Sequence, residues 1–210
     1  MNQTAICNLA LLRIGIATPI ADITESSVAA RALNSVWEQC VRTMLRERPW
    51  PFAIRQVDLA LVGTQIFSDW QFTYRYPSNF INIHRINAPI VAASTSPVVH
   101  NIIDRAPAPQ SYPYAVGSDA SGKLIHTDIE EAIVLGTVYI TDVSMYDPLF
   151  TSALSWFLGA EIALSLTKNR DIYGNAKSQY DALVSEAAAA SLNEPKPREV
   201  CDADMIQARG

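Results

Sequence analysis

The spacing of apolar residues changes twice along this 210-residue chain, and that change constrains the fold more than any other feature. Up to Pro49 the apolar positions recur every three or four residues, as in a helix that buries one side. From Ala53 to Asp142 short segments rich in β-branched and aromatic residues alternate with turn residues, which is typical of strands. Helical spacing returns after Asp147. The pattern predicts an α+β fold with a strand-rich middle between helical ends.

The clearest helix is predicted over residues 26–47. Ser26 or Ser27 can cap its start, and Pro49 ends it because the residue before a proline is pushed out of the helical region. One face is an apolar stripe of Ala29, Leu33, Val36, Trp37, Cys40, Met44 and Leu45. The opposite face carries Arg31, Ser35, Glu38, Arg42 and Arg46. This charged face is expected to be solvated or to form half of a charged contact between subunits.

A second long helix is predicted from Pro148 to Thr167, with Asp147 as its N-cap. The segment has about the length of a membrane span, but it contains several Ser and Thr residues and has no aromatic belt at its ends. We therefore expect a buried helix, with its single charge, Glu161, paired to an arginine or a tyrosine hydroxyl. A line of small residues should let helix 26–47 pack closely against it: Ser155, Gly159 and Ala163.

The strands are expected at residues 53–61, 70–76, 80–86, 98–103 and 134–141, and a last helix from Ile172 to about Leu192. Residues 1–52 and 147–192 would form a helical bundle, with residues 53–146 inserted as an antiparallel β-domain.

Residues 193–210 are charged and interrupted by Pro195 and Pro197, so they carry too little apolar surface to fold alone. We expect them to form an extended C-terminal arm held by another chain. Its apolar anchors would be Val200, Met205 and Ile206.

The stretch GSDASGKL, residues 117–124, matches the P-loop spacing at Gly117, Gly122 and Lys123. Leu124 replaces the hydroxyl that would bind magnesium, and an alternating, strand-like segment follows where a P-loop has a helix. The stretch therefore predicts a hairpin turn in which the glycines supply positive φ angles, and no nucleotide site.

The chemistry-bearing residues form no recognisable catalytic or metal-binding motif. The cysteines Cys7, Cys40 and Cys201 are too few and too scattered for a disulfide framework or a zinc site. We therefore predict no catalytic residue, no cofactor and no metal. The alternative is a small α+β enzyme with a histidine site in the strands, built on His100 with Asp104 or on His126 with Asp128. Half-buried structural histidines, His84 included, are the simpler interpretation.

Three stretches resemble a known family. ALNSVWEQCVRTMLRERPWPFAIRQVDLAL resembles the opening of the tail tubular protein A family, the head-to-tail adaptors of short-tailed bacteriophages, through Leu45, Pro49, Trp50, Phe52 and Ala53. DWQFTYRYPSNFINIHRI is similar to a second block of that family through Trp70, Tyr74 or Tyr76, Pro77 and Ile81. YITDVSMYDPLFTSALSWFLGAEIALSLT is similar to a third, with Tyr146 in place of the common Phe and Gly159 where Ala is frequent.

The resemblance implies a non-enzymatic virion protein that forms a ring, usually of twelve copies, beneath the portal. The ring would join the portal to the tail tube or nozzle, and double-stranded DNA would pass through it without sequence-specific binding. The formal net charge of −5 suits that role, because a negative ring repels the duplex whereas a basic ring would grip it. No membrane is implied. The expected subunit or portal contacts are Arg31, Glu38, Arg42, Arg46, Pro195, Pro197, Val200, Met205 and Ile206.

Overall fold

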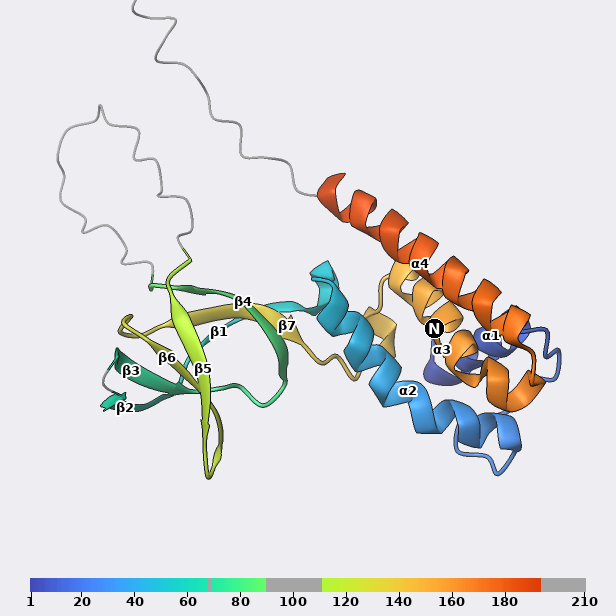
Figure 1. Ribbon diagram of the computed structural model, residues 1–210, viewed down its shortest axis with the longest axis horizontal. Coiled ribbons are helices and arrows are strands. Elements are labelled where there is room, and N and C mark those ends of the chain that lie inside the picture. Colours follow the sequence, from blue (N-terminus) through green and yellow to red (C-terminus); the bar gives the residue numbers. More distant parts are fainter. Residues whose placement is uncertain (68, 90–110, 194–210) are drawn as a thin grey trace, which may run out of the picture. The chain divides into compact units, whose positions relative to one another are not determined.

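The computed structural model describes residues 1–67, 69–89 and 111–193 (Figure 1). In these ranges the chain has four α-helices, and its seven strands form two antiparallel sheets, which confirms the α+β class. The helices are α1 (Gln3–Arg13), α2 (Val28–Glu47), α3 (Pro148–Thr167) and α4 (Arg170–Asn193). The strands are β1 (Ile54–Asp58), β2 (Leu61–Phe67), β3 (Trp70–Arg75), β4 (Phe80–Asn87), β5 (Tyr114–Asp119), β6 (Gly122–Thr127) and β7 (Ile133–Val138).

The chain divides into two compact units. Met1–Cys40 and the chain from Tyr146 onward form the first, which we call the helical unit. Val41–Met145 forms the second, the strand unit. The division falls inside α2, so this one helix begins in the helical unit and ends in the strand unit. The expected arm at residues 193–210 lies, after Asn193, outside the described residues.

In the helical unit, α3 packs against both α4 and α1. Asp147 caps its start as predicted, since its carboxylate accepts hydrogen bonds from the backbone N–H groups of Leu149 and Phe150 at 2.7 and 3.4 Å. Toward α4, the rings of Phe157 and Tyr180 stack with their centroids 4.8 Å apart. A local capping signal and a long-range ring contact therefore hold the same helix in place.

The small-residue line on α3 does bring a neighbouring helix close, but the neighbour is α1. A Cβ atom built on Gly159 would lie 3.2 Å from Cγ2 of Ile14 and 3.3 Å from the carbonyl oxygen of Ala10. The expectation that helix 26–47 packs at this seam is therefore wrong at Gly159. A small residue shows only that a backbone can approach there, because any apolar helix of suitable shape could fill the space.

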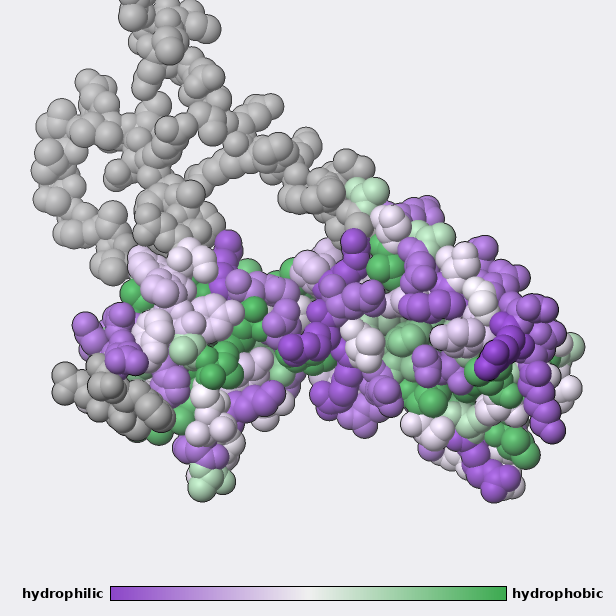
Figure 2. Space-filling model, viewed as in Figure 1, coloured by the Kyte–Doolittle hydropathy of each residue, from purple (hydrophilic) through white to green (hydrophobic). Residues whose placement is uncertain are grey.

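Glu161 of α3 is exposed to solvent, so the expected buried partner is not needed. Leu164, one turn further, is also 45% exposed, and the fully buried positions lie mainly in the first three-quarters of the helix. Among the described residues α3 is the one helix long and apolar enough to cross a membrane, and half of its apolar window is buried within the protein. Figure 2 shows hydrophobic and hydrophilic residues interspersed over the drawn face of the helical unit.

The strand unit contains a three-stranded sheet in the order β1-β7-β4 and a four-stranded sheet in the order β2-β3-β6-β5. Strands expected at 70–76, 80–86 and 134–141 are present as β3, β4 and β7. The strand expected at 98–103 lies outside the described residues. The two-residue alternation in the sequence therefore located three of the strands to within one or two residues at most boundaries.

The single strand expected at 53–61 is wrong, because the chain changes sheet inside it. β1 ends at Asp58 and β2 begins at Leu61. Between them the N–H of Leu59 donates to the carbonyl of Ala132 at 2.9 Å, while the carbonyl of Ala60 accepts from the N–H of Arg75 at 2.8 Å. No glycine or proline marks this crossing, so the sequence carried no turn signal for it.

Candidate functional site

The stretch with P-loop spacing is a β-hairpin, as predicted. β5 and β6 pair in continuous register from Tyr114 opposite Thr127 to Asp119 opposite Gly122, which leaves Ala120 and Ser121 as the turn (Figure 1). No helix follows Lys123, so its backbone offers none of the converging N–H groups that hold phosphates in a P-loop.

The two glycines of this hairpin act differently, which corrects the expectation of positive φ at both. Gly122 has a φ of +134°, in a region that L side chains rarely adopt. Gly117 lies within β5 without a positive φ, but a Cβ atom there would be 2.7 Å from Nε2 of His126. Gly117 is therefore required for space rather than for backbone conformation.

An ion pair fixes the tip of the hairpin. Two guanidinium nitrogens of Arg75, at the end of β3, donate to the two carboxylate oxygens of Asp119 at 2.9 and 3.0 Å. The same carboxylate accepts from the N–H of Ser121 at 2.8 Å. The hydrogen bonds from Arg75 lower the pKa of Asp119 below its usual value. Arg75 and Asp119 are 44 residues apart, so only the fold brings them together.

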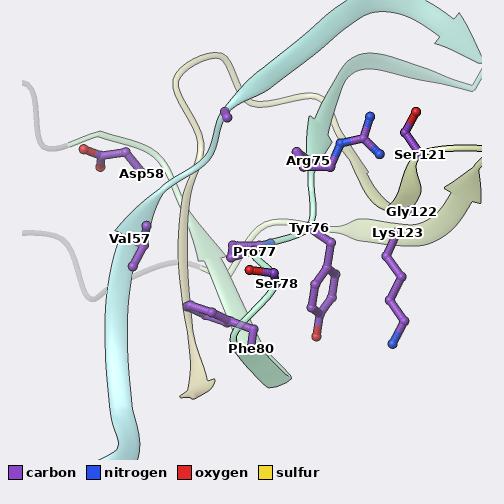
Figure 3. Close-up of a pocket in the computed structure, with 11 residues that line it drawn as sticks. Val57, Asp58, Arg75, Tyr76, Pro77, Ser78, Phe80, Ser121, Gly122 and Lys123 are labelled. Carbon is purple, nitrogen blue, oxygen red and sulfur yellow. The ribbon is translucent and has the colours of Figure 1, made fainter. Parts of the chain in front are cut away.

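A pocket of about 480 Å³ opens beside this hairpin, within the strand unit. Three segments line it: the end of β1, the turn between β3 and β4, and the hairpin tip (Figure 3). Its lining residues are Val57, Asp58, Ala60, Arg75, Tyr76, Pro77, Ser78, Phe80, Ser121, Gly122 and Lys123. Sequence reasoning singled out Gly122 and Lys123 as parts of a hairpin turn and gave no signal that the lining residues form a group.

The side chains of Lys123 and Tyr76 lie next to each other at one side of the pocket (Figure 3). The ammonium nitrogen of Lys123 is 5.4 Å from the centroid of the Tyr76 ring, a cation–π distance. Burial raises the pKa of Tyr76, so its hydroxyl is neutral at ordinary pH. The arrangement can bind charged and apolar groups, and it contains no nucleophile paired with a base.

The described histidines are engaged with threonine hydroxyls. Nδ1 of His126 lies 3.0 Å from Oγ1 of Thr73, and Nε2 of His84 lies 2.8 Å from Oγ1 of Thr137. His84 is half-buried as expected, whereas His126 is buried, with 5% of its surface exposed. Asp128, its proposed partner, accepts from the backbone N–H of Gln71 at 3.0 Å.

The other proposed histidine site, His100 with Asp104, lies outside the described residues. In the part of the chain that the structure describes, no group of three or more His, Cys, Asp and Glu residues could hold a metal ion.

The charged face of α2 divides between the two units. Arg31 and Glu38 are exposed in the helical unit. In the strand unit, the guanidinium of Arg42 lies 4.4 Å from the ring centroid of Tyr139, and that of Arg46 donates to the carbonyl of Ile81 at 3.1 Å. Arg42 and Arg46 thus contact the sheet as well as solvent. The other proposed contact residues, Pro195, Pro197, Val200, Met205 and Ile206, lie outside the described residues.

The residues that carry the family resemblance lie at the connection between α2 and β1. Leu45 and Ala53 are fully buried, and Trp50 is 5% exposed. The indole N–H of Trp50 donates to the carbonyl of Met44 at 3.1 Å, which satisfies one of the carbonyls left unpaired at the end of a helix. These residues therefore end the helix and anchor the start of the sheet.

The third stretch of the resemblance lies at the connection back to the helices. The ring of Tyr146 packs edge-on against that of Phe150, with centroids 4.8 Å apart, next to the Asp147 cap. In the second stretch, the buried Tyr74 donates its hydroxyl hydrogen to the carbonyl of Ile129 at 2.7 Å. All of these roles are structural.

Comparison with protein-family models and with curated proteins finds no match to this chain.

Proposed function

We propose that this protein is a structural virion protein, a head-to-tail adaptor that forms a ring between the portal and the tail tube or nozzle. One observation carries the proposal: the residues shared with the adaptor signatures are the ones that join helices to strands. Trp50, Ala53 and Tyr146 are buried at the two chain crossings between helical and strand-rich sequence. Residues in such positions determine an architecture, and the resemblance is therefore one of architecture.

In this proposal the helices from both ends of the chain form a bundle, and the bundles of neighbouring copies pack side by side around the ring. Residues 1–52 and 147–192 contribute the bundle, and residues 53–146 the projecting β-domain. Residues 193–210 form the extended arm that reaches a neighbouring subunit or the portal. Arg31 and Glu38, both exposed on α2, would contribute to contacts between copies.

The charge of the protein supports a channel through which DNA passes. A surface that grips DNA without sequence preference needs an excess of Lys and Arg to displace counterions from the phosphates. This chain has 16 Lys and Arg against 21 Asp and Glu. A ring of such subunits repels the duplex and lets it move.

The experiment is a measurement of particle mass, with the full-length protein alone and after mixing with portal rings purified from the same virus. We expect native mass spectrometry or electron microscopy to show a cyclic assembly on the portal, with twelve copies as the expected number. A protein that stays monomeric and does not bind the portal rings at any concentration would contradict the proposal.

A further inference from the structure

The pocket of the strand unit has an unpaired charge of each sign. In the described part of the chain, Lys123 and Asp58 form no ion pair, whereas Arg75 is neutralised by Asp119. Figure 3 shows Asp58 and Lys123 on opposite sides of the pocket. The lining holds one free ammonium and one free carboxylate, so the pocket suits a ligand that carries both charges.

The wall between these two charges is largely apolar. Val57, Pro77 and Phe80 lie there, with Tyr76 beside Lys123 (Figure 3). Val57 is 40% exposed, so part of this apolar surface is open to solvent. An apolar side chain that covers this surface would stabilise the complex in proportion to the apolar area removed from water. The pocket therefore fits a peptide in which apolar residues lie next to residues of both charges.

One segment of this chain has that composition. Residues 194–210 read EPKPREVCDADMIQARG, in which Asp202 and Asp204 directly precede Met205 and Ile206. Basic residues lie on both sides of the acidic pair, with Arg198 before it and Arg209 after it. The segment follows Asn193, the last residue of α4, and an extended chain of this length spans up to about 55 Å. That reach exceeds the diameter of a small domain, about 30 Å.

We propose that residues 198–206 of a second copy bind in this pocket, with Asp202 or Asp204 paired to Lys123, Arg198 paired to Asp58, and Met205 against Phe80 and Val57. The inference rests on the proposed function in one respect, because it requires neighbouring copies. Beyond the proposed function, the inference identifies the surface that binds the C-terminal arm and the charged residues that favour this binding.

Disulfide trapping in the full-length protein tests the contact. Ser78 is exposed at the pocket, so Ser78→Cys places a thiol there, and Cys201 supplies the partner from the arm. Cys7 and Cys40 do not compete, because both are buried and burial raises the pKa of each thiol to about 12. Under mild oxidation we expect disulfide-linked dimers and larger species on a non-reducing gel, and their loss when Cys201→Ser is added.

The control is Ser35→Cys, an exposed serine on α2 in the helical unit that does not line the pocket. Its disulfide with Cys201 should form at least about fivefold more slowly than that of Ser78→Cys. Lys123→Glu in the Ser78→Cys background should slow linkage by about fivefold or more, the effect of losing a partly exposed charge pair and adding repulsion. Asp202→Lys with Asp204→Lys should restore it, and Lys168→Glu, an exposed lysine in the helical unit, should change nothing.

Three results would overturn the inference: equal rates of disulfide formation at Ser78→Cys and Ser35→Cys, a rate at Ser78→Cys that does not depend on the charge of residue 123, or a disulfide formed only within one chain. The proposed function fails by a different result, the absence of rings and of portal binding by the unmodified protein. A protein that forms rings on the portal but shows no link to Ser78→Cys leaves the function standing and removes this contact alone.

Discussion

At the scale of single residues, the close contact between Gly117 and His126 determines what β5 can carry. The imidazole lies over Gly117 with Nε2 2.7 Å from where a Cβ atom would be, while Nδ1 is held 3.0 Å from Thr73. The ring therefore cannot move away without losing that partner. Gly117→Ala should destabilise the protein by about 1–3 kcal/mol, the usual cost of adding a methyl group to a filled space.

Urea unfolding of the wild type and the variant measures this difference. The matched control is Gly174→Ala in α4, where a Cβ atom would meet nothing within 4 Å. There the change should stabilise by up to about 1 kcal/mol, because glycine is a poor helix former. If Gly117→Ala is as stable as the wild type, the packing of His126 over β5 is wrong.

His84 should make stability depend on pH. Its burial lowers its pKa below the ordinary value of 6.5, so the unfolded chain binds the proton more readily than the folded chain does. Its contribution is complete above about pH 6.5 and decreases as the pH falls from there toward the folded pKa. His84→Gln, which keeps a hydrogen-bonding group near Thr137, should lose less stability between about pH 7 and pH 5.5 than the wild type.

Free energies of unfolding at several pH values, for both proteins, check this prediction. Carboxylates with lowered pKa values, such as Asp119, titrate at lower pH and so do not affect this range. Parallel pH profiles for the two proteins would show that His84 is not responsible.

At the scale of elements, the contact between α1 and α3 depends on Gly159. Its Cβ position is 3.2 Å from Ile14, so an alanine requires a small adjustment and a leucine requires the helices to separate. Gly159→Leu should cost about 1–3 kcal/mol, and Gly159→Ala clearly less. Thermal unfolding followed by circular dichroism measures both.

A double-mutant cycle shows which helix Gly159 faces. Ile14→Ala removes the side chain nearest to it and should recover part of the loss in Gly159→Leu. Trp37→Ala in α2 should not recover any of it. Recovery by Trp37→Ala alone would instead favour α2 as the partner at this seam.

At the scale of the whole molecule, the C-terminal segment is expected to act in assembly rather than in folding. All four described helices end at or before Asn193. Deleting residues 193–210 should therefore leave a folded monomer of normal helicity that no longer docks onto portal rings. Far-UV circular dichroism measures the helicity of the truncated protein, and co-sedimentation with portal rings measures its docking. A truncated protein that binds the portal with undiminished affinity would exclude the arm as the docking element.

Some of the candidate site could be foreseen and some could not. The hairpin at 117–124 was predicted because its glycines and alternating residues are local signals, and the rejection of a nucleotide site follows from the strand after Lys123. The Arg75–Asp119 pair and the apolar wall of the pocket were not foreseen, since they join residues from three separate segments. The strand break at Leu59 was missed because no glycine or proline marks it.

The sequence by itself determined the α+β class, the helical ends around a strand-rich middle, the Asp147 cap and the hairpin. Each of these depends on residues within one or two turns of one another, where spacing, capping and backbone freedom act directly. Only the tertiary structure decided that α1 fills the space beside Gly159, that Glu161 lies in solvent, and that Lys123 and Asp58 line one pocket. These outcomes depend on which surfaces meet across the chain, and many apolar surfaces could meet with similar energy until shape and close packing select one.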